Sequence, residues 1–154
     1  MMGWVNAWNT IIRRIIFQDE ELKSLMKIPQ GTSIINFIDN YFIKAGYTNK
    51  LLTNETCRII YSDVKASDTN VPNITRNILA FDIYVKIEDL HNVGNDRLVF
   101  RTQLIAARLK HLLMKERYLL DSGYKMSMAG EWDNGTRTNG YARYTIAFYY
   151  MKVY

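Results

Sequence analysis

Few residues of this chain are of the types that perform chemistry, and they are scattered along it. The two histidines, His91 and His111, are far apart in sequence, and Cys57 is the only cysteine. A metal site needs several His, Cys or carboxylate ligands at short spacing, and no such cluster occurs. Cys57 lies within an apolar stretch, which favours a buried small hydrophobic residue over a nucleophile. We therefore expect no metal and no cofactor.

Catalytic groupings are equally weak. Asp121, Ser122 and His111 could be parts of a hydrolase triad, but no nucleophile-elbow motif surrounds the serine. Glu88 and Asp89 are adjacent at the expected end of a strand, where carboxylates commonly remain solvated. The glycines are spaced like turn and bulge residues, and none forms a phosphate-binding loop. The sequence predicts a protein that is not an enzyme.

The aromatic residues are a better indication of function. Eleven Tyr, three Trp and six Phe make up 13% of the chain, and Tyr and Trp are enriched at protein interfaces because they combine contact area with a polar group. Arginines along one helix can also contact a neighbouring subunit, with the acidic run 19–21 as a possible partner. The alternatives are an aromatic core and solvated arginines. The candidate interface residues are Trp4, Trp8, Tyr84, Arg97, Arg101, Arg108 and Arg143.

Length and charge restrict the class of protein. The chain has 154 residues and a net charge of +5, so we expect one domain over 1–154, long enough to bury a core without disulfides or metals. The charge permits a nucleic-acid partner without requiring one; contact would be through Arg13, Arg14, Lys110 and Arg137. No apolar run approaches the ~20 residues that a membrane helix needs. We therefore predict a soluble domain without a membrane partner.

The amino-terminal region, residues 1–46, is expected to be helical. Trp4, Trp8 and the isoleucines that follow recur at helical spacing and form one apolar stripe over residues 4–16. A short second helix opens with the acidic residues at 19–21, which suit the positive end of the helix dipole, and ends at Pro29. A third helix is predicted over 33–44, where an extended conformation is the alternative.

The apolar period then changes from 3.6 to 2. Strands are predicted over 57–61 and 77–88, and the second of these alternates cleanly between apolar and polar residues. The polar segment 62–76 between them is longer than the usual connection of ~4–6 residues. We predict that it is a mobile contact loop that becomes ordered only in an assembly. Its candidate contact residues are Asp68, Asn70, Pro72 and Asn73.

A long helix over 96–118 follows, capped by Asn95 or Asp96. Strands are then expected over 124–132 and 141–153, with a polar turn at 133–140 between them. The predicted fold class is α/β (α+β). A mainly antiparallel four-stranded sheet is built from two hairpins, the long helix crosses one face, and the core over 56–154 has the order β-β-α-β-β. The opposite face carries Tyr84 and Arg143, which are too amphipathic for bare solvent, so we expect assembly.

Several strings in the chain resemble those of the small head–tail joining (neck) proteins of tailed bacteriophages, and the tail-terminator, or tail-completion, group in particular. The resemblance covers most of the chain. The similar strings are Leu79–Lys86, Asp96–Leu98, Ile105–Leu109, Asp19–Pro29, Cys57–Ile59 and Gly140–Tyr144.

The resemblance implies a non-enzymatic virion component that is assembled in the host cytoplasm. Its subunits would form a ring, commonly a hexamer, that caps the tail tube. The ring would also contact neck, connector or portal-proximal proteins, and DNA would pass through it. Two alternatives stay open: a connector ring on the portal side, and a basic α/β module that contacts nucleic acid directly.

Overall fold

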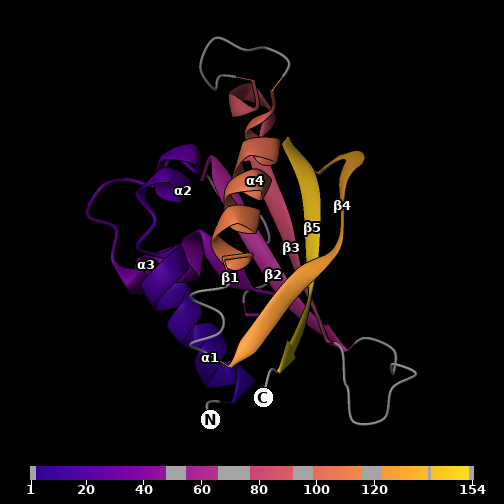
Figure 1. Ribbon diagram of the computed structural model, residues 1–154. Coiled ribbons are helices and arrows are strands. Elements are labelled where there is room, and N and C mark those ends of the chain that lie inside the picture. The colour runs from indigo at the N-terminus through magenta and orange to yellow at the C-terminus, as the bar shows by residue number, and fades with distance from the viewer. Residues whose placement is uncertain are drawn as a thin grey trace.

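The computed structural model describes residues 3–47, 55–65, 77–91, 99–115, 123–138 and 140–152. It is a mixed α/β fold with one five-stranded sheet in the order β1-β2-β3-β5-β4 and helices against one of its faces (Figure 1). The strands are β1 (Phe42–Lys44), β2 (Cys57–Lys65), β3 (Asn77–Lys86), β4 (Tyr124–Thr138) and β5 (Tyr141–Lys152). The helices are α1 (Trp4–Ile11), α2 (Glu20–Leu25), α3 (Ile34–Asn40) and α4 (Arg101–Leu113), with a π-helical turn η1 (Ile12–Ile16) and a 3-10 turn η2 (Ile87–Asp89).

The four longer strands pair as the alternating pattern predicts. β2 and β3 form one antiparallel pair, β4 and β5 form another, and β3 joins β5 antiparallel in the middle of the sheet. Leu79, Phe81, Ile83 and Val85 are all buried beneath the helices, which confirms the predicted inner face of β3. We call this the inner face of the sheet and the opposite side the outer face.

The sheet has a fifth strand that was not predicted from the sequence. Residues 42–44 were expected to end the third helix, but α3 stops at Asn40 and Phe42–Lys44 pair in parallel with β2. Phe42 and Ile43 are buried there. Aromatic and β-branched side chains fit a half-buried strand well, so pairing with β2 prevails over helical spacing.

Three further boundaries also differ. β2 continues to Lys65, so the first residues of the predicted loop 62–76 are strand; residues 66–76 lie outside the described part of the chain, as do its four candidate contact residues. β4 runs through most of the predicted turn 133–140, with a register shift between Asp133 and Arg137. α4 begins at Arg101 because Gln103 accepts a hydrogen bond from the Phe100 backbone N–H (3.2 Å), so the predicted cap at 95 or 96 is wrong.

The amino-terminal helices and the sheet share one core. Trp8, Ile11 and Ile16 of the predicted stripe are buried in the same cluster as Phe81 of β3 and Leu109 of α4. Trp4 stacks on Tyr150 of β5 with the ring centroids 3.7 Å apart. The apolar stripe of the amino-terminal segment therefore belongs to the subunit interior, although the sequence could not separate that role from an interface.

Candidate assembly face

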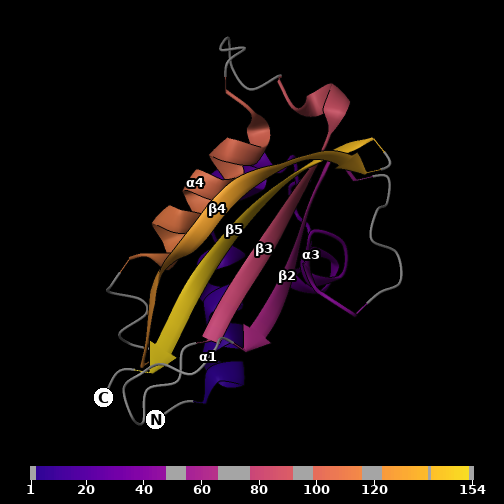
Figure 2. The ribbon, with the colours of Figure 1, turned by 90° about the vertical axis from the view of Figure 1, so that its right-hand side faces the viewer.

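The outer face of the sheet carries large amphipathic side chains, and no described helix packs over it (Figure 2). Tyr84 of β3 stands directly between Arg58 of β2 and Arg143 of β5 in the strand register. Ile60, Tyr84 and Tyr141 form a small second apolar cluster on this face, separate from the main core. The sequence expectation that Tyr84 and Arg143 lie together on this face is confirmed.

Polar groups on the outer face are linked across strands. Arg143 Nη2 donates to Asn134 Oδ1 (3.0 Å), and Asn134 Nδ2 donates to Thr145 Oγ1 (2.7 Å). The Thr145 hydroxyl in turn donates to Asp82 Oδ1 (2.6 Å). Arg143 Nε is buried and has no acceptor within the described part of the chain. A buried N–H without a partner costs about 1–3 kcal/mol, so this atom lowers the stability that the network gives the single subunit.

The same face extends to the β1 side of the sheet. Arg58 is buried and its Nε donates to the Asn40 carbonyl (3.2 Å), while the Tyr141 hydroxyl donates to the Glu55 carbonyl (2.7 Å). Burial lowers the pKa of the Arg58 guanidinium and raises the pKa of the Tyr141 phenol. Arg58 is 2% and Tyr141 4% exposed, so this part of the face is already desolvated in the single subunit.

Of the other predicted interface residues, Trp8 and Arg101 lie inside the subunit and Trp4 is partly buried against its core. Trp8 is in the core, and Trp4 Nε1 donates to Asp63 Oδ2 (2.8 Å). Arg101 is 5% exposed; its guanidinium donates to the backbone carbonyls of Leu25 (2.7 Å) and Asp89 (3.0 Å). Its expected contact with a neighbour is therefore wrong. Arg97 lies outside the described residues.

Arg108 does find the acidic run at 19–21, but within the same chain. Its Nη2 and Nε donate to the two carboxylate oxygens of Asp19 (2.6 and 2.9 Å), and its Nη1 lies 2.9 Å from Glu21. Arg101 and Arg108 are seven residues apart, so they project from nearly the same side of α4, and that side faces α2. The expected intersubunit ion pair is an intrasubunit one.

Asp19 makes the stability of this contact depend on pH. The Arg108 hydrogen bond lowers the pKa of the Asp19 carboxyl, and the Leu22 backbone N–H, which Asp19 caps, also lowers it, while burial opposes both. A lowered pKa in the folded state adds stability above the ordinary value of 3.8, and that stability is lost as pH falls through the folded-state pKa.

We expect Asp19→Asn to cost roughly 1–2 kcal/mol at neutral pH, because asparagine keeps the cap but removes the charge. The difference between wild type and variant should shrink as pH falls below the ordinary carboxyl range. Urea unfolding at several pH values measures it. A difference that stays constant with pH would show that the ion pair does not stabilise the fold.

Of the catalytic candidates from the sequence, Asp121 and Ser122 lie outside the described residues. Cys57 is fully buried, as predicted, and burial raises the pKa of its thiol to about 12. Asp89 accepts from Lys27 Nζ (2.9 Å), and His111 is exposed on α4. Within the described ranges, no three His, Cys, Asp or Glu side chains come close enough to hold a metal ion, and no described helix could cross a membrane.

Comparisons with known proteins leave the family open. No family model matches the chain, and no curated protein matches it. Five chains of known structure match. One of them aligns over 95% of this chain and 96% of its own length, at 12% sequence identity and a TM-score of 0.42. Function is therefore argued from the residues of this chain.

Two features of the surface were not predicted from the sequence. Trp132 was placed in a strand but not singled out, although it is half-exposed on the outer face of β4 beside Gly130. Its alternation with Glu131 and Asp133 was the available sign that it does not face the core. Asn134 was assigned to a turn, whereas it joins the polar network of the sheet.

Proposed function

We propose that the protein is a structural subunit at the head–tail junction of a tailed bacteriophage, where a ring of subunits caps the tail tube. The outer sheet face carries this proposal: Arg58, Tyr84 and Arg143 lie side by side across three strands, and no described helix lies across them. Its central side chains Ile60, Tyr84 and Tyr141 are only 4–7% exposed within the subunit, whereas Trp132 at the β4 edge is 50% exposed; Tyr, Trp and Arg are enriched at protein interfaces.

The strings that resemble tail terminators support the proposal by their position. Leu79–Lys86 is most of the central strand β3, and Ile105–Leu109 is the middle of α4. Residues 141–144 begin β5, directly beside β3. The resemblance thus falls on the elements that build the sheet and its helical cover, whereas residues 96–98 lie outside the described part.

The mechanism would be geometric. A ring of identical subunits, a hexamer by the resemblance, closes because unlike surfaces meet after a fixed rotation. One side of the ring would receive the last layer of tail tube protein, and the other side would receive a connector or portal-proximal protein. Because the second side does not resemble the tube, it offers no template for another layer. DNA would pass through the bore of the assembled virion.

The direct test adds the purified protein to tail tube protein that is polymerising in solution. A terminator stops growth at one end of each tube. Tubes that elongate as fast with the protein as without it would contradict the terminator function and favour a connector ring on the portal side.

Direct nucleic-acid binding is the weaker alternative. Its candidate residues come from separate elements: Arg13 and Arg14 from η1 and Lys110 from α4, where Lys110 pairs with Glu131 (3.0 Å). The side chain of Arg137 lies outside the described part. Binding of DNA by the isolated protein that weakens steeply with salt would favour this alternative.

A further inference from the structure

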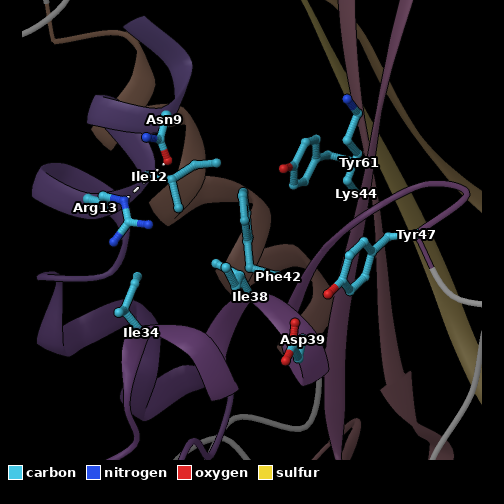
Figure 3. A pocket seen from close by; sticks show the side chains of 10 residues that line it. All are labelled: Asn9, Ile12, Arg13, Ile34, Ile38, Asp39, Phe42, Lys44, Tyr47 and Tyr61. Carbon is cyan, nitrogen blue, oxygen red and sulfur yellow. Dashed lines mark hydrogen bonds between the residues drawn. The ribbon is translucent and has the colours of Figure 1, made fainter. Parts of the chain in front are cut away.

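A groove lies between the amino-terminal helical segment and the β1 edge of the sheet, and we call it the β1 groove. It consists of two adjoining hollows of about 180 and 290 Å³ that share Asn9, Ile12, Lys44 and Tyr61. Ile12, Ile38 and Phe42 form an apolar floor in the first hollow (Figure 3). A cavity of ~150 Å³ with apolar walls can hold one benzene ring, so the groove has room for an aromatic side chain.

Two cations stand on opposite walls of the β1 groove. Arg13 comes from η1 and Lys44 from β1 (Figure 3). Arg13 Nε donates to Asn9 Oδ1 (3.2 Å), and in the described part of the chain neither cation forms an ion pair. Of the lining carboxylates, Asp39 stands near the floor, and Asp63 accepts from Trp4 and Tyr150. The described part of the lining thus holds two cations and two carboxylates, and Arg13 and Lys44 are the groups that can pair with a carboxylate on an incoming segment.

Exposed apolar side chains gather at the same place. Among the described residues, Val5 (78% exposed) and Tyr47 line the groove, and the exposed Ile35 follows its lining residue Ile34 on α3. Exposed apolar groups around a hollow indicate a surface that another chain covers.

The same chain carries a matching segment at the opposite edge of its sheet. Trp132 of β4 is 50% exposed and is flanked by Glu131 and Asp133. Glu131 pairs with Lys110, and Asp133 is exposed beside it. Because β4 is an edge strand, a neighbouring subunit at that edge can contact side chains on both faces of the strand. β1 and β4 are the two opposite edge strands of the five-stranded sheet. Trp132 therefore lies far from the β1 groove of its own subunit, and the groove that it would enter is that of another subunit.

We propose that the β1 groove binds Trp132 of a second copy of this chain, with Asp133 of that copy facing Lys44. This inference rests on the proposed assembly function and names the contact that would join neighbours. Since the two edges differ, the contact is head-to-tail, and its repetition closes a ring when the rotation between neighbours divides a full turn. Tryptophan in a desolvated pocket is the side chain most typical of an interface hot spot.

The test measures the mass of purified particles over a range of concentrations by mass photometry. We expect the wild type to form a closed oligomer and Trp132→Ala to raise the concentration needed for assembly at least tenfold. Met114→Ala is the matched control, because Met114 is also an exposed apolar residue but lies outside the groove. Circular dichroism and the melting temperature verify that each variant is folded.

Exchanging the charges of Lys44 and Asp133 tests the proposed contact between these two residues and does not depend on Trp132. Lys44→Glu should weaken assembly, and adding Asp133→Lys to it should restore assembly. A wild type that stays monomeric at every concentration would overturn both the inference and the assembly function. A wild-type oligomer that is unaffected by Trp132→Ala, or a charge exchange without restoration, would overturn only the inference and leave the proposed function standing.

Discussion

Trp8→Ala is expected to lower the free energy of unfolding by ~3–5 kcal/mol, the usual cost of deleting a buried tryptophan side chain. Trp8 is 7% exposed and lies within an aromatic cluster that joins α1 to three strands. Its ring centroid is 5.6 Å from Tyr61, 5.9 Å from Phe81 and 6.2 Å from Phe42. Because these contacts come from β1, β2 and β3, the deletion would loosen the helical layer from the sheet.

Thermal unfolding measures this effect. A loss of that size should lower the melting temperature by roughly 10 °C, at ~2–4 °C per kcal/mol for a chain of this length. Arg14→Ala is the control on the same helical segment; Arg14 is exposed on η1 and does not line the β1 groove, so its effect should stay within ~0.5 kcal/mol. Equal melting temperatures for Trp8→Ala and wild type would show that α1 does not contribute to the core.

Arg101→Ala is expected to cost on the order of 3 kcal/mol, because hydrogen bonds from a charged donor are worth ~1.5–3 kcal/mol each and buried carbonyls lose their partner. The Arg101 guanidinium ties the start of α4 to the last residue of α2, through Leu25, and to η2, through Asp89. Without this guanidinium, α4 loses the hydrogen bonds that join it to α2 and to η2.

Urea unfolding of Arg101→Ala, Arg101→Lys and Arg14→Ala separates the possible causes. Lysine keeps the charge but lacks the planar fork that reaches two carbonyls, so Arg101→Lys should fall between wild type and Arg101→Ala. Arg14 is exposed on η1, and Arg14→Ala should leave the unfolding free energy nearly unchanged. If Arg101→Ala were as stable as Arg14→Ala, the buried guanidinium would not hold these elements together.

Local periodicity predicted the elements that are long and amphipathic. The alternation of β3 follows directly from the residues at 79–86, because every second side chain is apolar and one face is covered. The apolar stripe at residues 4–16 likewise predicted a helical segment, although its last turn is π-helical. In both cases the pattern repeats over several turns or pairs, so a single exceptional residue does not obscure it.

The elements that depend on distant partners could not be predicted in the same way. The three residues of β1 are strand because β2 lies beside them. The boundary of α4 depends on local hydrogen bonding at Phe100. Arg108 meets Asp19 across most of the chain, and no spacing rule distinguishes that contact from one with a neighbouring subunit.

The candidate assembly face was predicted in part. Period-2 alternation was enough to place Tyr84 and Arg143 on one face, because their strands are regular. The β1 groove was not predictable, because its walls come from α1, η1, α3 and three strands whose packing no local pattern encodes. Trp132 became informative only when its exposure was known.

Capping of tail tubes by the purified protein tests the central proposal most directly. Tube lengths would be measured by electron microscopy after adding wild type, Ala80→Arg or Ala107→Arg. Ala80 is on the outer face of β3, and Ala107 is exposed on α4, so the two variants add the same charged side chain to opposite sides of the subunit.

We predict that wild type and Ala107→Arg stop tube growth at one end, whereas folded Ala80→Arg does so poorly because arginine on the outer face obstructs the covering protein. Uninterrupted tube growth in the presence of folded wild-type protein would contradict the account.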